Sequence, residues 1–523
     1  IQNIAFGEEN VIRDHVLYLN KESLAEEVMK DKRIKKVDFD IARPGESVRI
    51  IPVKDVIEPR AKLEGDIFPG IFKETMEEGG YGVTYALKGC AVTTTGPIVG
   101  FQEGLIDMSG PAAEYTPFSK LNHLVMVIEK QPEFDAHEHE QMVRMAGIRL
   151  AAFVGQLAVG QEEYESEEYT WDSIGEKYAQ YPDLPRVAYV QMLQSQGLLH
   201  DTYVYGVDAK KTLPTILSPT EIMDGAIVSG NCVSACDKNP TYVHENNPVV
   251  HDLFEEHGKT LNFVCQIITN ENVYLADKER SSDWTAKLCK MLDLDGVIVS
   301  QEGFGNPTTD LMLVCQGLEK RGIKTVIITN EDAGVDGMSE SLPDSVTEAD
   351  AIVSTGNSNA TIMLPKMEKT IGVLSDVAKT TGGNVDSIQD DGRLLIEIHG
   401  WSQSAGKYLP GSNYNLRSRR KMKKVLFYTN QFFGQIGGEA EAYQKPFIEQ
   451  GARGNAQAFV PLLEDAEIVA TIVCGDNYYA ENMDEVKAFV EAQITELSPD
   501  LIIAGPAFNA GRFGIACADI CKD

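Results

Sequence analysis

Cysteine and long apolar runs are both scarce in this chain. Its nine cysteines, an odd number scattered over 523 residues, exclude a disulfide framework and predict a reducing, cytoplasmic setting. The most apolar stretch, Leu150 to Gly160, contains Gln156 and is too short to cross a bilayer. No basic region followed by an apolar core opens the sequence, so neither a signal peptide nor a membrane span is predicted.

Positive charge is also in short supply. The 47 lysines and arginines face 79 acidic residues, a net charge of −32, and the sequence pI is about 4.7. Such a surface repels nucleic acid and anionic membranes, which are therefore not expected as partners. The 43% hydrophobic and 24% charged residues are typical of folded protein, and at roughly 100–200 residues per domain the length indicates three or four domains.

The N-terminal part, residues 1–160, is predicted to be a β-rich domain. Ser47–Val53 and Leu121–Ile128 are β-branched or apolar runs bounded by Gly and Pro. His137–Leu157 then has helical spacing, with six residues on one face: Met142, Met145, Ala146, Leu150, Phe153 and Val154. Residues 161–231 begin with an acidic run, interpreted as a solvated linker, and complete this first part.

Residues 232–415 show the pattern of a parallel α/β domain. Asp295–Ser300, Lys324–Thr329 and Ala349–Ser354 are expected to be buried strands, with a helix over Thr308–Lys320. Apolar strands separated by helices of this length indicate parallel βαβ units. The fold class predicted for the chain is therefore α/β, with a β-rich N-terminal domain followed by parallel-sheet domains.

A basic junction at residues 416–424 precedes a second α/β segment, residues 425–523. Six of the eight residues from Arg417 to Lys424 are basic, and an apolar strand follows Met422 at once. This resembles the start of a second polypeptide joined to the first. Ile468–Val473 and Leu501–Ala504 are predicted strands, and Met483–Leu497 a helix. Since the chain begins at Ile1 and has no terminating pattern, we expect both ends to be cut.

The segment Ser229-Gly-Asn-Cys-Val-Ser-Ala-Cys-Asp-Lys-Asn-Pro240 is the most informative motif. A thiol after Gly-Asn could attack the preceding carbonyl, and β-elimination followed by hydrolysis would leave a pyruvoyl group at position 232. From spacing alone, however, Cys232 is more simply a small buried hydrophobe. Cys232 and Cys236 lack the second ligand pair of a zinc site, and their spacing is not that of a redox pair.

Three further clusters have both a functional and an ordinary interpretation. His137-Glu-His-Glu140 offers metal-ligand types, but a solvated helix N-terminus is favoured. Gln301–Thr308 forms a βα turn with Gly303 and Gly305; it lacks the third glycine of a dinucleotide fingerprint. Arg512, after the loop Gly505–Gly511, would suit a substrate carboxylate.

Three longer motifs together resemble one family: Ala42-Arg-Pro-Gly-Glu-Ser-Val-Arg-Ile50, Thr94–Glu103 continuing through Asp107–Pro111, and Asn231-Cys-Val-Ser-Ala-Cys-Asp-Lys238. The family is the proprotein of the alpha and beta subunits of component B of glycine, sarcosine or betaine reductase. The resemblance implies cleavage before Cys232, with Asn231 as the new C-terminus and the pyruvoyl group as a cofactor derived from Cys232. It changes the favoured interpretation of Cys232 from packing to catalysis.

Residues 422–523 resemble the N-terminal part of the gamma subunit of the same component, through Ile436–Pro446 and Gly505–Arg512. The resemblance implies a hetero-oligomer whose partners are a gamma-type subunit, a small selenoprotein (component A) and an acetyl-phosphate-forming component C. Selenocysteine is expected on partner chains and is absent here. The gamma-like part is incomplete, and the subunits, normally separate, are joined in this chain.

The mechanism implied by the resemblance is reductive cleavage of a C–N bond. An amine substrate condenses with the pyruvoyl carbonyl, a selenolate takes the carboxymethyl group, and ammonia or an amine leaves. Betaine has no N–H and cannot form a Schiff base, so glycine is preferred, then sarcosine. The alternatives are a D-proline reductase-like pyruvoyl enzyme, a non-catalytic binding or assembly subunit, and a nucleotide-binding protein using Gly303–Thr308. The residues themselves name no acid or base; Asp237, Lys238 and His244 are the neighbours in sequence.

Overall fold

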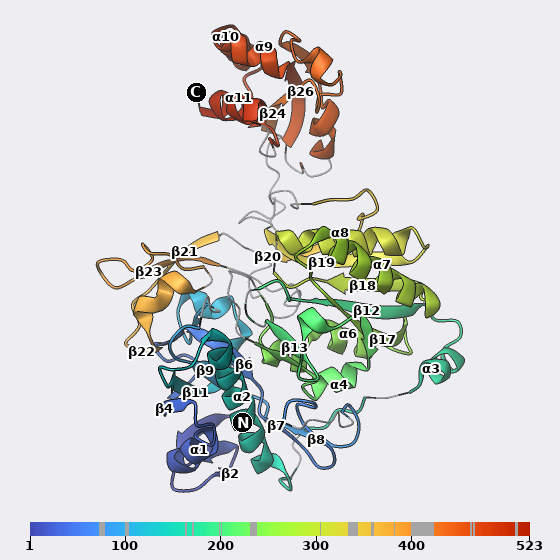
Figure 1. Cartoon of the computed structure of the whole chain (residues 1–523). Coiled ribbons are helices and arrows are strands. Elements are labelled where there is room, and N and C mark those ends of the chain that lie inside the picture. The colour runs from blue at the N-terminus through green and yellow to red at the C-terminus, as the bar shows by residue number, and fades with distance from the viewer. Residues whose placement is uncertain are drawn as a thin grey trace. The chain divides into compact units, whose positions relative to one another are not determined.

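The computed structural model describes residues 1–72, 79–99, 104–162, 165–169, 172–197, 199, 201–230, 238–303, 305–332, 344–356, 360–380, 382–398, 423–460, 463, 466–507 and 511–522. The chain divides into two units, Ile1–Ser412 and Asn413–Asp523, and each is considered by itself (Figure 1). Asn231, Cys232, Cys236, Asp237 and nearly all of the basic junction lie outside the described residues.

The strands of the first unit are β1 (Asn3–Phe6), β2 (Val11–Arg13), β3 (Val16–Leu19), β4 (Ile34–Ala42), β5 (Val48–Ile51), β6 (Val53–Ile57), β7 (Arg60–Lys62), β8 (Thr84–Ala86), β9 (Cys90–Thr95), β10 (Ile106–Asp107), β11 (Asn122–Lys130), β12 (Arg186–Leu193), β13 (Thr202–Val204), β14 (Val207–Asp208), β15 (Thr215–Leu217), β16 (Ile227–Ser229), β17 (Asn262–Asn270), β18 (Gly296–Ser300), β19 (Lys324–Asp332), β20 (Ile352–Gly356), β21 (Ala360–Leu364), β22 (Lys369–Gly372) and β23 (Leu394–Ile398). Its helices are α1 (Lys21–Val28), α2 (Ala136–Gly155), α3 (Ile174–Gln180), α4 (Pro219–Met223), α5 (Thr241–Glu245), α6 (Pro248–Glu256), α7 (Leu275–Met291) and α8 (Asn306–Glu319).

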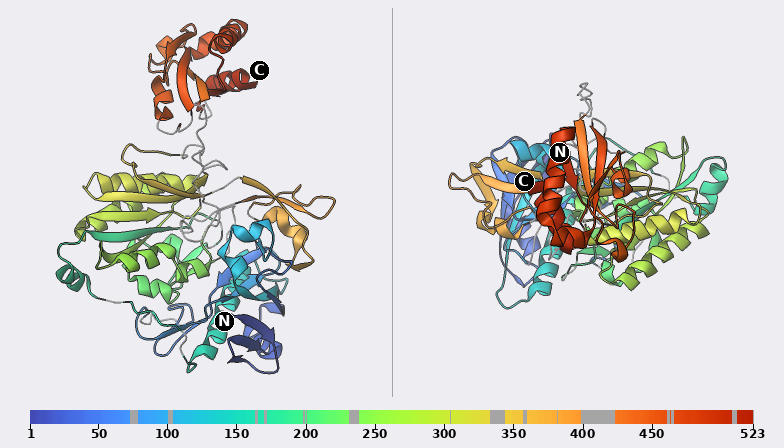
Figure 2. Two further views of the ribbon diagram at one scale, coloured as in Figure 1. Left: turned by 180° about the vertical axis from the view of Figure 1, so that it is seen from behind. Right: turned by 90° about the horizontal axis from the view of Figure 1, so that it is seen from above.

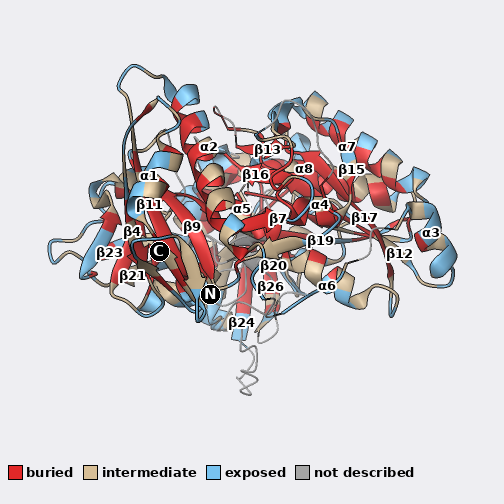
Figure 3. Ribbon diagram, turned by 90° about the horizontal axis from the view of Figure 1, so that it is seen from below, coloured by how far each residue is buried: buried red, intermediate tan, exposed pale blue. Residues whose placement is uncertain are grey.

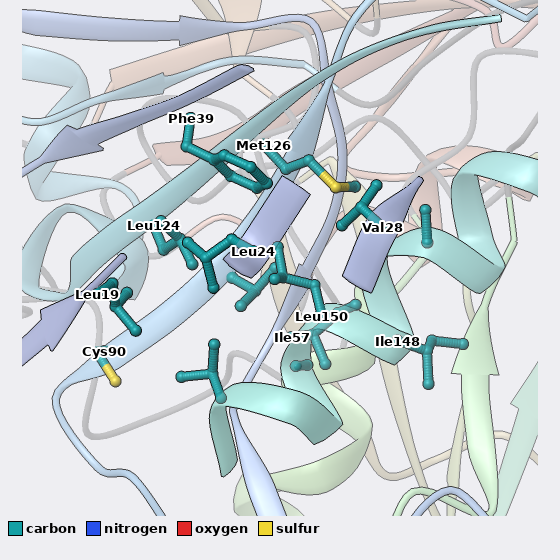
Figure 4. Packing of buried hydrophobic residues seen from close by; sticks show 14 of the residues in the cluster. Leu19, Leu24, Val28, Phe39, Ile57, Cys90, Leu124, Met126, Ile148 and Leu150 are labelled. Carbon is teal, nitrogen blue, oxygen red and sulfur yellow. The ribbon is translucent and has the colours of Figure 1, made fainter. Parts of the chain in front are cut away.

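A four-stranded sheet in the order β4-β11-β9-β6 forms the N-terminal core. Because side chains alternate across a strand, Leu124 and Met126 face α1 and α2, whereas Val125 faces the small sheet β10-β5-β22. Figure 4 shows Leu24 and Val28 of α1 meeting Met126 and Leu150 in this core. The predicted β-rich N-terminal part and the helix near residues 137–157 are confirmed.

A six-stranded sheet in the order β15-β17-β12-β18-β19-β20 forms the second core. Its five strands from β17 to β20 pair in parallel, and only β15 is antiparallel. Ala188 and Val190 pack toward α7 and α8, while Tyr189 between them packs toward α4 and α6. Helices thus cover both faces (Figures 1 and 2), and the predicted parallel α/β architecture is confirmed.

This sheet combines chain from both sides of residue 231. Strand β12, which precedes residue 231, lies between β17 and β18, which follow it. Likewise β22 pairs with β5 across more than 300 residues. Figure 3 shows burial concentrated in these central strands, with exposed residues on the outer side of α7. The part before residue 231 and the part after it therefore share their cores.

The second unit is a smaller sheet in the order β25-β26-β24-β27. Its elements are β24 (Lys423–Asn430), β25 (Phe447–Gln450), β26 (Ala466–Cys474), α9 (Asp476–Glu481), α10 (Met483–Leu497), β27 (Leu501–Ala504) and α11 (Gly511–Lys522). Strand β24 pairs in parallel with both β26 and β27. The helices pack on one face through Val486, Val490 and Phe513. Met483–Leu497 has the predicted bounds.

Candidate functional site

The two described ends of the 231–237 segment lie close together and are buried. Strand β16 pairs with β13 up to Ser229, and the Gly230 amide donates to the Asp201 carbonyl at 2.7 Å. On the far side of the segment, Lys238 is fully buried. Its Nζ donates to Ser229 Oγ and, at 2.5 Å, to the Gly230 carbonyl oxygen. A lysine thus connects the two ends of the segment that contains Asn231 and Cys232.

Thr241, the first residue of α5, connects β16 to β6 of the N-terminal sheet through hydrogen bonds. Its hydroxyl accepts from the Ser229 amide at 2.9 Å and donates to Asp55 Oδ2 at 2.6 Å. The Thr241 amide donates to Asp55 Oδ1 at 2.9 Å. Burial raises the pKa of Asp55 to about 6, against the opposing effects of Lys238 and Thr241. This carboxyl therefore exchanges a proton within the physiological pH range.

Glu302 lies directly after β18, at the carboxyl end of a central parallel strand. Its Oε2 accepts from the Gln194 amide at 2.7 Å, and its Oε1 accepts from the Asn239 amide at 3.3 Å. Burial raises the pKa of Glu302 to about 7, although these hydrogen bonds and Lys238 oppose the shift. Ligands of open α/β sheets bind at the carboxyl ends of the strands, where this group lies.

His244 on α5 faces Glu302, with 3.4 Å between its Nε2 and Glu302 Oε1. Its Nδ1 is 3.1 Å from Gln191 Nε2, and Gln191 Oε1 accepts from Gln266 Nε2 at 2.6 Å. Since an amide nitrogen can only donate, the proton of the neutral ring is assigned to Nε2, on the side of Glu302. Burial lowers the pKa of His244 to about 3, with Lys238 adding to the shift, so the ring is neutral at pH 7.

Two further buried polar groups complete the cluster. Glu271 follows β17, and its Oε1 accepts from the Glu302 amide at 2.8 Å. Burial, followed by the charge of Glu302, raises the pKa of Glu271 well above its ordinary range. Neither amide atom of the Asn239 side chain has a hydrogen-bond partner among the described residues, although Asn239 is only 1% exposed. A buried, unsatisfied amide is costly, and a polar ligand would satisfy it.

A narrow, partly open gap, too tight for a water molecule, adjoins the same two residues, Ser229 and Gly230. It is lined by Lys54, Asp55, Ile57, Thr94, Val143, Arg144, Gly147, Ser229 and Gly230. Burial lowers the pKa of Lys54 to about 7, against the charge of Asp376. The surroundings of the 231–237 segment thus combine buried amines, carboxyls that bind protons near neutral pH and unsatisfied amide groups. Such a set of groups is typical of a site that handles protons.

Of the predicted site residues, Asn231 and Cys232 lie outside the described residues, as does Asp237. The structure does bring Lys238 and His244 into one cluster, since the backbone amide of Asn239, next to Lys238, donates to Glu302 Oε1, which lies 3.4 Å from His244 Nε2. The sequence interpretation missed Asp55, Glu271 and Glu302. Glu302 had a signal, its place after a predicted buried strand, but only the glycines of that turn were considered.

The expectation that His137–Glu140 is a solvated helix start is wrong for its second half. His139 and Glu140 are 3% and 0% exposed. Glu140 accepts from Arg144 Nε at 2.9 Å and from the Tyr203 hydroxyl at 2.9 Å. Asp135, with Glu138 at the third position, caps α2 in a capping box, so the helix begins one turn before the buried pair. Glu140 is buried together with its hydrogen-bond partner Tyr203, which is 63 residues away in the sequence.

Arg512 also differs from expectation, because its guanidinium is engaged within the chain. It pairs with Glu439 at 3.0 Å and donates to Asn477 Oδ1. Over the described ranges, no group of three His, Cys, Asp or Glu side chains could hold a metal ion, and no helix is long and apolar enough to span a membrane.

Two family models match the chain. Residues 1–408 match the glycine/sarcosine/betaine reductase component B subunits, and residues 422–523 match the glycine/sarcosine/betaine reductase selenoprotein B. The chain belongs to the family of component B subunits of glycine, sarcosine and betaine reductases, which are parts of an oxidoreductase complex. Its C-terminal region is similar to the selenoprotein B family, as the sequence resemblance predicted.

Individual relatives agree with both matches. The glycine reductase complex component B subunits alpha and beta of Peptoclostridium acidaminophilum are 58% identical over 400 residues, 76% of this chain and 93% of the relative. The sarcosine reductase complex component B subunit alpha of the same organism is 51% identical over equal shares. The gamma subunit of the Symbiobacterium thermophilum glycine reductase component B is 49% identical over 100 residues, 19% of this chain but only 23% of that relative.

Proposed function

We propose that this chain is a proprotein of component B of a glycine reductase, activated by cleavage between Asn231 and Cys232. The observation that carries the proposal is the buried polar cluster around Gly230 and Lys238, at the two ends of the cleavage segment. The relative with 58% identity, named as subunits alpha and beta together, supports a single chain that gives two subunits. Sarcosine and betaine reductase relatives are less similar, at 51% and 38% identity.

The fold is compatible with an internal cut. Because β12 lies between β17 and β18, the fragments before and after residue 231 share one sheet and would stay together. Further hydrogen bonds cross the same boundary, such as those from Thr241 to Asp55. Cleavage therefore changes the covalent connection without removing either fragment from its core.

A pyruvoyl group at residue 232 would supply an electron sink that weakens the C–N bond of a bound amine. The residues of this chain would do the rest. Glu302, with a pKa of about 7, holds or releases a proton close to Asn239. His244, neutral at pH 7, would place its Nε2 proton on the side of Glu302, with Nε2 3.4 Å from Glu302 Oε1. Lys54, whose pKa burial lowers to about 7, would pair with a substrate carboxylate in its protonated form.

The proposed partners are a gamma-type subunit carrying selenocysteine, a small selenoprotein and an acetyl-phosphate-forming component. The products would be acetyl phosphate and ammonia, with glycine preferred to sarcosine and betaine.

The deciding experiment is intact-mass spectrometry of the purified protein with and without a carbonyl-trapping hydrazide. We expect a fragment that begins at residue 232, lacks the thiol and gains the hydrazide mass. Cys232→Ala should remain one chain, whereas the control Cys289→Ala, at a buried cysteine of α7, should cleave normally. A wild-type chain that stays intact and gains no hydrazide mass would contradict the proposal and favour a binding or assembly subunit. Turnover of glycine, sarcosine and betaine with the partner components then identifies the substrate.

A further inference from the structure

The buried Lys238 has a geometry that packing alone does not require. Its Nζ reaches back across the cleavage segment to Ser229 Oγ and the Gly230 carbonyl, the last two described residues before Asn231. Consecutive Cα atoms are about 3.8 Å apart. Lys238 binds the carbonyl of Gly230. The proposed cut is at the carbonyl carbon of Asn231, the residue directly after Gly230.

Charged and titratable groups face Lys238 from several elements. Asp55 on β6, Asp201 before β13, Glu302 after β18 and His244 on α5 all respond electrostatically to its charge. Each carboxyl also accepts backbone hydrogen bonds from other residues, for Asp201 from the Gly197 amide at 2.7 Å. Burial raises the pKa of all three carboxyls, so they take up protons more readily than exposed ones.

The cleavage chemistry creates a charge at this place. Overall, the peptide bond and the cysteine side chain react with two water molecules to give a carboxylic acid on residue 231, the ketone at residue 232, ammonia and hydrogen sulfide. The amide C–N bond and the cysteine Cβ–S bond break, as does the Cα–N bond of residue 232 in the hydrolysis that releases ammonia, and no outside oxidant or reductant is needed. At neutral pH the new acid ionises, which places a negative charge beside Gly230, where solvent is excluded. A buried charge is tolerated only with a partner.

Resting on the proposed function, we propose that Lys238 is the positioning residue for this cleavage. It holds the Gly230 end of the segment in place before the reaction and pairs with the new C-terminal carboxylate of residue 231 afterwards. The role belongs to the Nζ position as well as to its charge, because its hydrogen bonds to Ser229 Oγ and to the Gly230 carbonyl hold these two residues in place.

The test follows the cleaved fraction of the full-length chain over time, by denaturing gel and intact mass, in two Lys238 variants and a matched control. Removing a charged hydrogen bond raises the activation free energy of cleavage, so Lys238→Met should cleave at least about tenfold more slowly than the wild type. Lys238→Arg, which keeps the charge, should recover part of the rate. Lys177→Met should cleave like the wild type; Lys177 is 5% exposed and also donates to two backbone carbonyls, those of Phe263 and Val264.

A purely structural role is separated by chemical rescue. Lys238→Ala leaves space for a small amine, so ethylammonium should raise its cleavage rate in a saturable way, and ethanol should not. Full-rate cleavage of Lys238→Met would overturn the inference, as would a folded Lys238→Ala protein that ethylammonium does not help. If Lys238→Met does not fold, Lys238→Arg decides. A folded Lys238→Arg protein that cleaves no faster than Lys238→Ala would also overturn the inference. A wild-type chain that never cleaves would instead contradict the proposed function.

Discussion

Arg60 on β7 is the centre of a buried ion cluster that joins parts of the chain from before and after residue 231. Its guanidinium lies 2.7 Å from Glu58 Oε2 and 3.8 Å from Glu245 Oε1, and it donates to Asn246 Oδ1 at 2.9 Å. The Glu58 amide also donates to Glu245 Oε2 at 2.9 Å. Glu58 and Arg60 precede residue 231, whereas Glu245 and Asn246 follow it, so the cluster would hold together the two fragments of the proposed cleavage.

Replacing Arg60 by Met removes the cation and leaves two buried carboxyls. Glu58 keeps a contact with Lys88 at 3.2 Å, but Glu245 loses its cation. Breaking a buried pair by removing one partner costs about 3–5 kcal/mol. We therefore expect Arg60→Met to lower the free energy of unfolding of the first unit by about that amount. Arg13→Met removes an exposed pair with Glu9, side chains 59% and 65% exposed, and should cost about 0–1 kcal/mol.

The pH dependence adds a second criterion. Burial raises the pKa of Glu245 to about 8 even with Arg60 present. Without Arg60 the pKa of Glu245 rises further, so at pH 6 its protonation removes part of the penalty. Burial raises the pKa of Glu58, but Arg60 and Lys88 bring it below its ordinary value, so the loss of Arg60 raises this pKa as well. At pH 9, ionising the Glu58 and Glu245 carboxyls costs more free energy in the variant than in the wild type. The difference between the two proteins should therefore be larger at pH 9 than at pH 6.

The assay is urea unfolding followed by circular dichroism at pH 6 and pH 9, on wild type, Arg60→Met and Arg13→Met. In cleaved protein, the fragments of Arg60→Met should also separate at lower urea on gel filtration. A loss no larger than that of Arg13→Met, or a loss that is greater at pH 6, would refute the reasoning about this cluster.

Three further predictions concern single residues. Between pH 4.5 and about 8, folded Glu245 holds a proton that the unfolded chain lacks, so the contribution of Glu245 to wild-type stability falls as pH rises through this window. Glu245→Gln should therefore flatten the dependence of the free energy of unfolding on pH by up to about 1.4 kcal/mol per pH unit, measured by urea midpoints. Glu302→Gln should remove from the pH–rate profile of substrate turnover the group that titrates near pH 7, and an unchanged profile would exclude Glu302 as that group. Gly372→Ala should destabilise the fold by more than about 2 kcal/mol, since φ is +102° and a Cβ would lie 2.0 Å from the Ile51 carbonyl oxygen; unchanged thermal unfolding would contradict this.

Local patterns predicted much of the fold. The apolar runs at residues 295–300 and 324–329 became β18 and β19, and the helix at 483–497 has the predicted bounds. These elements follow from periodicity and side-chain propensity, which depend on neighbours in sequence. The burial of Glu140 could not be predicted in this way, because it depends on Tyr203 and on the packing of α2 against its sheet.

The sequence proposed Asn231 and Cys232 as the site, which stays a prediction, and it marked none of the buried carboxyls around Lys238. The Gly-Asn-Cys motif identified residues 231 and 232 by the chemistry of a thiol beside a peptide bond and by family resemblance. Asp55 and Glu302 carried no such mark, because a carboxyl in a strand or a turn is usually solvated. Their raised pKa values arise from burial, which is created by distant parts of the chain.

The sequence by itself determined the class of elements, the acidic charge, the family and the position of the proposed cut. The tertiary structure alone decided which groups surround that cut. It brings Asp55 from β6 to Thr241 of α5, sets Glu302 after β18 opposite His244, and points Lys238 back to Gly230. The physical reason is that an element forms from contacts within a few residues, whereas removing a carboxyl or an amine from water requires the whole core to close around it.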